Sequence, residues 1–151
     1  MSQRMPDANT HLPEIQQLAG LMVRSVGNGS VPATTTSLVY LRAGHIVGST
    51  YQVIRHSADL RKAGEPEHRI TAVATWPDAP YFTEPERAAL ALTDAVFTPA
   101  APGTERVPEA LFTETTKHYD DKAMATLMLT LATAGFWMNV ALVSTPDPLP
   151  A

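Results

Sequence analysis

The sequence contains no cysteine among its 151 residues. A thiolate is the reactive group of thiol peroxidases, disulfide exchange enzymes and cysteine nucleophiles, and it is a common zinc ligand. These chemistries are therefore excluded for this chain. The missing cysteine does not indicate a compartment, because such chains occur in both reducing and oxidising surroundings.

Clusters of basic residues are also missing. The chain has 11 Lys and Arg against 15 Asp and Glu, a formal net charge of −4, and its longest basic run is the pair Arg61 and Lys62. A phosphate backbone or an anionic membrane surface binds through clustered basic side chains. We therefore expect neither nucleic acid nor a membrane as a partner.

Long apolar runs are scarce. The first twenty residues lack the apolar segment of a secretory signal, and no later run reaches the ~18 apolar residues that a membrane span needs. We therefore expect a cytoplasmic protein. The length fits one domain over residues 1–151, with a core over about 12–145 and flexible tails.

Proline and glycine divide the chain into blocks with apolar residues at helical spacing. The predicted helices cover about 12–26, 34–45, 49–64, 66–75, 87–97, 108–118 and 123–143. Prolines predict loops at 76–80 and 98–103. No segment shows a convincing strand pattern, so the prediction is an all-α fold. The last helix is apolar nearly all round, which is typical of a core helix or an oligomer interface.

Capping motifs support these helix starts. The S/T-x-x-E/Q capping box occurs at Ser49 with Gln52 and at Thr83 with Glu86. Asp120 or Asp121 is a suitable cap for the last helix. We assign Glu84, Glu86 and Arg87 to capping and to the helix dipole rather than to chemistry.

The run Trp76–Ala95, WPDAPYFTEPERAALALTDA, resembles the alkylhydroperoxidase D-like (AhpD-like) branch of the carboxymuconolactone decarboxylase family. The run Leu38–Arg42, then Gly48 and the positions of Ser49 and His56, keep the family's order, and the similarity extends over about 12–145 through the helix carrying Trp137. The resemblance implies an AhpD-like helical bundle. It also implies a homo-oligomer, commonly a trimer or hexamer, with a helical pair packed across subunits.

This chain departs from the family's peroxidase motif. Peroxidase members carry Cys-x-x-Cys-x-x-x-His at a helix N-terminus, with an acidic residue twelve positions before the first Cys. The corresponding residues here are Ser49, Gln52, His56 and, at the acidic position, Ser37. Peroxide cannot oxidise a serine hydroxyl to a sulfenic acid, and Gln52 cannot resolve such an intermediate. We therefore expect a family member that has lost thiol peroxidase chemistry.

The motif positions are candidates for binding a small molecule. Spacings of three and four place Ser49, Gln52 and His56 on one helix face. Ser49 and Gln52, with Tyr51 between them, are candidate substrate-binding residues; the alternative for the first two is the capping box. Aromatic side chains could line a pocket, although burial in the core is the commoner role. These are Tyr51, Trp76, Tyr81, Phe82 and Trp137.

Two histidines are candidate catalytic residues. His56 is the candidate general acid/base, because an imidazole titrates near neutral pH. The alternative is a histidine that is hydrogen-bonded to Asp59, three residues on. His45 would join it if the preceding turn faces the same side; otherwise it is a loop histidine. His45, His56 and His118 lack the close paired spacing of metal ligands, so we expect no metal, and no cofactor is indicated.

Three hypotheses follow for the function. The first is a small-molecule-binding protein or degenerate enzyme of this family. The second is a non-redox decarboxylase or lactone-type enzyme that uses His56, with or without His45, to move a proton. The third is a structural oligomeric scaffold. The sequence does not identify the ligand.

Overall fold

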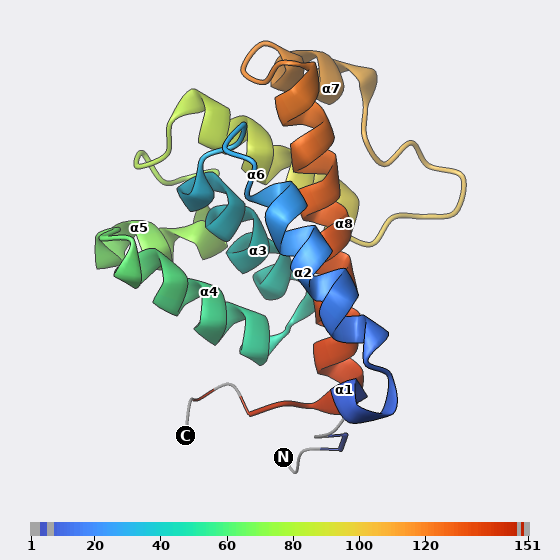
Figure 1. Ribbon diagram of the computed structural model, residues 1–151. Coiled ribbons are helices and arrows are strands. Elements are labelled where there is room, and N and C mark those ends of the chain that lie inside the picture. Colours follow the sequence, from blue (N-terminus) through green and yellow to red (C-terminus); the bar gives the residue numbers. More distant parts are fainter. Residues whose placement is uncertain (1–3, 6–7, 148, 150–151) are drawn as a thin grey trace.

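The computed structural model describes residues 4–5, 8–147 and 149, and these residues contain helices but no strands (Figure 1). The α-helices are α1 (Ala8–His11), α2 (Glu14–Val26), α3 (Ala33–Val47), α4 (Thr50–Lys62), α5 (Glu67–Ala72), α6 (Glu84–Phe97), α7 (Glu109–Thr116) and α8 (Asp121–Ser144), with a 3₁₀ turn η1 (Val73–Thr75) after α5. The predicted all-α fold is confirmed. The predicted flexible tails fall largely on residues outside those described.

Helix α3 lies at the centre of the bundle and packs against α4, α6 and α8 (Figure 1). Its Leu38 and Leu41 belong to one buried cluster, which includes Leu90 of α6. Its Val39 belongs to a second cluster, which includes Leu127 of α8. Apolar side chains on two sides of α3 therefore join the two halves of the core.

Helix α8 is the longest element and starts as predicted. The Asp120 carboxylate accepts a hydrogen bond from the Ala123 amide at 2.8 Å. The hydroxyl groups of three buried threonines of α8 donate hydrogen bonds to the carbonyl oxygens four residues earlier. These threonines are Thr126, Thr130 and Thr133. Their hydroxyl groups are therefore paired although they lie in the core.

By length and composition, α8 could cross a membrane, with a mean hydropathy of 1.6 over its most apolar window. The sequence expectation concerned an unbroken run of apolar residues, and in α8 such a run is interrupted by threonines and by Asn139. A core helix of a soluble protein passes the same test, and α8 packs against α2, α3, α6 and α7. The finding is weak evidence for a membrane span.

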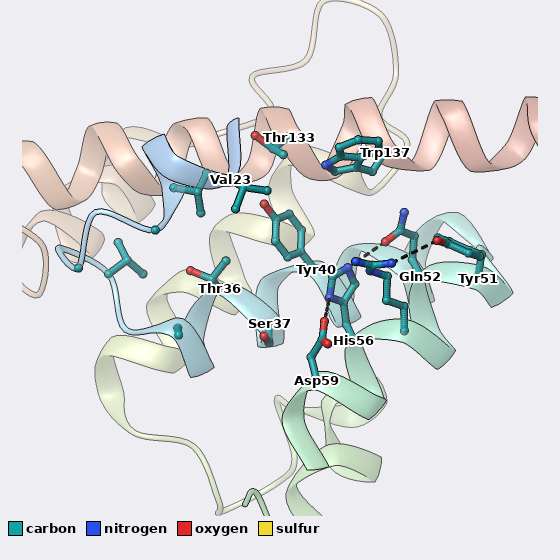
Figure 2. A pocket seen from close by; sticks show the side chains of 16 residues that line it. Val23, Thr36, Ser37, Tyr40, Tyr51, Gln52, His56, Asp59, Thr133 and Trp137 are labelled. Atoms are coloured by element: carbon teal, nitrogen blue, oxygen red, sulfur yellow. Dashed lines mark hydrogen bonds and ion pairs between the residues drawn. The ribbon is translucent and has the colours of Figure 1, made fainter. Parts of the chain in front are cut away.

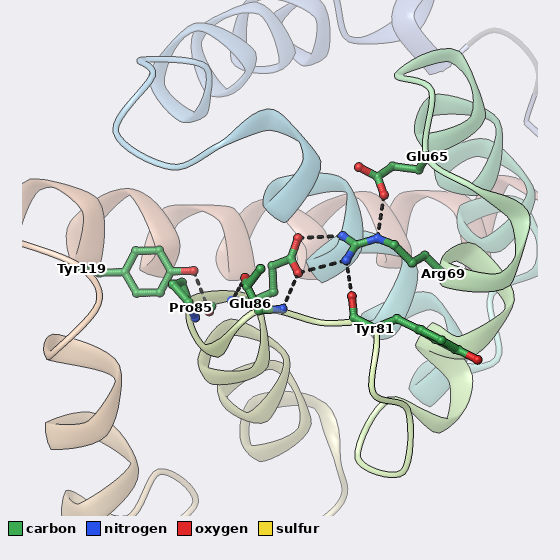
Figure 3. Close-up of polar contacts among 7 residues, drawn as sticks. Glu65, Arg69, Tyr81, Pro85, Glu86 and Tyr119 are labelled. Carbon is green, nitrogen blue, oxygen red and sulfur yellow. Dashed lines mark hydrogen bonds and ion pairs between the residues drawn. The ribbon is translucent and has the colours of Figure 1, made fainter.

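The start of α6 is tied to α5. The predicted capping box is confirmed, because the Thr83 amide donates to Glu86 at 2.8 Å and the Glu86 amide donates to the Thr83 hydroxyl. Glu86 also accepts a hydrogen bond from Arg69 at 2.7 Å. Arg69 donates in addition to Glu65 and to the Tyr81 carbonyl (Figure 3). This half-buried network fixes the loop between the two helices.

Two further arginines hold the loop at 76–80 and the turn before it. Arg87 donates to the carbonyls of Trp76, Pro77 and Ala79, and its guanidinium lies over the Trp76 ring. Its assignment to helix capping was therefore wrong. Arg42 of α3 forms a 2.6 Å ion pair with Asp94 of α6.

Candidate functional site

A cavity of about 460 Å³ lies between α2, α3, α4 and α8. Three valine side chains and the aromatic rings of Tyr40 and Trp137 contribute to its apolar walls (Figure 2). Its polar end is formed by one face of α4, with Tyr51, Gln52, Arg55, His56 and Asp59. A mostly apolar cavity with a few polar groups at one end is typical of a small-molecule site.

Glycine allows α3 and α4 to approach closely at this site. A Cβ atom at Gly44 would lie 3.1 Å from the Cβ of Gln52, so a larger residue would push the helices apart. Gly48 then ends α3 with a positive φ of 76°, which glycine adopts readily. The close approach brings Tyr40 against His56, and their rings stack with centroids 4.7 Å apart.

Both ring nitrogens of His56 are engaged. Nε2 lies 2.9 Å from Oε1 of Gln52, and Nδ1 lies 3.1 Å from Oδ2 of Asp59, the partner that the sequence predicted (Figure 2). Burial lowers the pKa of His56 to about 4, outweighing the attraction of the Asp59 carboxylate, and nearby Arg55 lowers it further. A neutral ring that is protonated at Nδ1 donates to Asp59 and accepts a hydrogen bond at Nε2. The donor at Nε2 is then the amide nitrogen of Gln52, which requires the amide group to be turned by about 180° so that its nitrogen takes the position of Oε1.

The predicted capping box at Ser49 was wrong. Ser49 holds the N-cap position of α4, but its side chain makes no capping hydrogen bond. The Gln52 side chain contacts His56, one turn further along the helix, instead of reaching back to the Ser49 amide. That amide donates to the Gly44 carbonyl at 2.9 Å.

Ser49 and Gln52 also open onto different spaces. Ser49 is buried and lines a second hollow, about 740 Å³ in volume, beside the C-terminal end of α8. Gln52 lines the cavity with His56, and Tyr51 lines both spaces. The structure therefore brings Gln52, Tyr51 and His56 together but separates Ser49 from them.

His45 lies apart from His56. It belongs to the last turn of α3, so the alternative of a loop histidine was wrong, and it lines neither hollow. Its Nδ1 atom is buried without a hydrogen-bond partner. Burial and, to a smaller extent, the charge of Arg42 lower its pKa.

The other aromatic residues divide between core and cavity. Trp76 and Phe82 are buried in the core, as favoured from the sequence, whereas Tyr81 is exposed. Trp137 lines the cavity beside Tyr40, which was not singled out as a site residue. Burial raises the pKa of Tyr40 to about 12, although its hydrogen bond with Thr133 opposes the shift, so its hydroxyl stays protonated at neutral pH.

Arg55 was also missed as a site residue. Its position four residues after Tyr51 was the available signal, because residues at this spacing share a helix face. No three His, Asp or Glu side chains of the described part of the chain converge to hold a metal. His118 instead lies 3.6 Å from Glu114 on the surface.

Comparison with known proteins agrees with this fold. An Agrobacterium tumefaciens structure of unknown function, named as a candidate antioxidant defence protein AhpD, superposes with a TM-score of 0.86 at 24% identity over 99% of both chains. The structure of a variant of the debrominase Bmp8 in complex with 2,3,4-tribromopyrrole gives a TM-score of 0.80 at 17% identity, over 93% of this chain and 73% of that one. At these identities the likeness shows the fold alone.

The sequence comparisons identify the family. The uncharacterised Bacillus subtilis protein YdfG is 26% identical over 130 residues, which is 86% of each chain. The sequence model of the carboxymuconolactone decarboxylase family matches residues 13–95, more than half of the chain. This protein, with its AhpD-like fold and its cysteine-free cavity, therefore belongs to the carboxymuconolactone decarboxylase family.

Proposed function

We propose that this protein binds a small molecule in the cavity between α2, α3, α4 and α8 and does so without thiol redox chemistry. The observation that supports this most is the cavity itself, with an aromatic wall at Tyr40 and Trp137 and a polar end around His56. Bmp8 shares this fold and is seen with a small ring compound. That is compatible with a ligand site here, but the ligand class depends on this chain's own residues.

A proton-transfer enzyme is less well supported. His56 is neutral at pH 7 and could accept a proton, yet both of its nitrogens already have partners. At the family's acidic position, Ser37 lines the cavity with a hydroxyl in place of a carboxyl group. The decarboxylase or lactone-type reaction stays a prediction, as does the purely structural scaffold.

Removing the aromatic wall should weaken binding. We expect Trp137→Ala to lower the affinity for small aromatic compounds about tenfold, because a ring packed against tryptophan loses its contact area. Saturation-transfer NMR identifies binders among such compounds, and calorimetry compares their affinities. Phe112→Ala is the matched control, because Phe112 is an exposed aromatic residue on α7, away from the cavity. Equal affinities for wild type and Trp137→Ala, or no binder to wild type, would refute the proposal.

We further propose that a second copy of the chain covers the exposed apolar faces of α2 and α8. Leu18 and Leu21 of α2 are 48% and 56% exposed, and Met128 and Val143 of α8 are 67% and 68% exposed. Helix α8 carries no charged residue after Lys122, so no charge on this helix beyond its first turn opposes burial of its exposed apolar side chains. Exposed apolar patches of this kind mark interaction surfaces.

Charges placed on this surface should dissociate the oligomer. We expect wild type to sediment as an oligomer and Leu21→Glu/Met128→Glu as a monomer with an unchanged helical circular dichroism spectrum, because a buried unpaired carboxylate is costly. Phe112→Glu on α7 is the control and should leave the mass unchanged. The proposed interface would be contradicted if the wild-type protein sedimented as a monomer, or if the double variant formed an assembly of the same mass as wild type. The expected trimer or hexamer is read from the same sedimentation data.

A further inference from the structure

The polar end of the cavity holds one cation without an anionic partner. Arg55 is the one Arg or Lys among the residues that line the cavity, and within the described part of the chain its side chain donates only to the Tyr51 hydroxyl, at 3.3 Å. No carboxylate of the described residues forms an ion pair with it. A guanidinium carries five N–H donors, so most of those of Arg55 remain available.

Five other arginines of this protein have partners within the protein itself. Arg42, Arg61 and Arg69 pair with carboxylates, and Arg87 and Arg106 donate to backbone carbonyls. The cavity's own carboxylate, Asp59, is already engaged by His56. Arg55 therefore faces a cavity whose nearest anion has another partner.

The rest of the cavity suits the aromatic ring of a ligand. Tyr40 and His56 stack with an interplanar angle of 26°, and both rings line the cavity, with Trp137 contributing from α8 (Figure 2). Ring faces pack favourably against other rings. Because burial keeps His56 uncharged near neutral pH, Arg55 supplies the positive charge of this end.

We infer that the ligand is an aromatic monocarboxylate, whose ring packs against Tyr40 and Trp137 and whose carboxylate pairs with the Arg55 guanidinium. This inference rests on the small-molecule binding proposed above. The planar fork of arginine matches a carboxylate with two parallel hydrogen bonds. Arg55 is itself exposed to solvent, so we expect the selectivity to come from this two-point geometry rather than from burial of the pair.

The test compares a carboxylate with its neutral amide on the same ring. We expect 2-naphthoate to bind the wild-type protein about tenfold more tightly than 2-naphthamide by calorimetry, since a charge-assisted pair replaces a neutral hydrogen bond. Arg55→Gln should remove this preference, and Arg55→Lys should keep part of it. Arg61→Gln is the matched control, because Arg61 lies on the same helix, is exposed and pairs with Glu67 outside the cavity.

A second readout is the titration of His56, followed by NMR. A carboxylate bound beside the ring should raise the pKa of His56, and the neutral amide should not.

The outcomes separate this inference from the binding function. Equal affinity for the acid and the amide, both weakened by Trp137→Ala, would refute the inference that the ligand is a carboxylate. It would remain consistent with a small-molecule site in this cavity. Tighter binding of the corresponding amine, 2-naphthylmethylamine, would also overturn it and indicate Asp59 as the partner. Failure of every compound to bind would refute both the inference and the proposed function. A preference for the acid that Arg55→Gln leaves intact would place the carboxylate elsewhere.

Discussion

Replacing Leu90 by alanine is expected to lower the free energy of unfolding by about 3 kcal/mol, within the range for leucines in well-packed cores. Leu90 is fully buried on α6 and packs in the cluster that includes Leu38 and Leu41 of α3. The truncation removes buried apolar atoms and leaves a cavity where α6 supports the central helix. Urea unfolding followed by circular dichroism, at one fixed protein concentration, measures the change.

The control for Leu90 is an exposed leucine. Leu12 is 52% exposed, and Leu12→Ala should change the unfolding free energy by less than about 0.5 kcal/mol. A loss below about 1 kcal/mol for Leu90→Ala would contradict the packing of α6 on α3 described here. An equal loss in the two variants would do the same.

Acidification is expected to destabilise the protein through His56. The pKa of His56 is about 4 in the folded protein, against 6.5 for an unperturbed histidine. Between these values the unfolded chain binds more protons than the folded one, so stability is full above pH ~6.5 and falls as the pH drops towards ~4. The shift corresponds to about 3 kcal/mol, because each pKa unit contributes ~1.4 kcal/mol.

The contribution of His56 is isolated by comparison with His56→Gln. The variant lacks the titrating group, so the stability difference between wild type and variant should shift by about 3 kcal/mol, against wild type, from pH 7.5 to pH 4. Urea unfolding at pH 7.5, 5.5 and 4 gives this difference. His11→Gln, at an exposed histidine, controls for the loss of an imidazole as such. Parallel pH profiles for wild type and His56→Gln would show that His56 is not buried as a neutral ring.

Local signals in the sequence predicted most of the fold. The box formed by Thr83 with Glu86 and the cap at Asp120 involve neighbours a few residues apart, and the structure confirms both. Ser49 with Gln52 fits the same pattern and fails, because His56 lies one helical turn beyond Gln52 and engages its side chain. A motif gives the possible hydrogen bonds but not which of two competing partners is taken.

The site was less predictable because it depends on how helices cross. The spacing of His56 from Gln52 placed them together on one face of α4, and both line the cavity. Tyr40 and Trp137 come from α3 and α8, and their positions depend on the close approach at Gly44 and on packing between distant segments. Spacing within one helix does not contain that information, and for the same reason it left open whether His45 joins His56; the structure shows that His45 does not line the cavity.

The two tryptophan indoles offer the most direct test of the proposed binding site. Trp137 lines the cavity, whereas Trp76 is buried in the core with its Nε1 donating to Asp94 at 3.0 Å. We would record ¹H–¹⁵N spectra during titration with 2-naphthoate and, separately, with 2-naphthamide, and assign the two signals with Trp137→Phe. Binding in the cavity predicts that at least one compound shifts the Trp137 indole signal and leaves that of Trp76 in place. A Trp137 signal that neither compound moves would contradict a ligand site in this cavity.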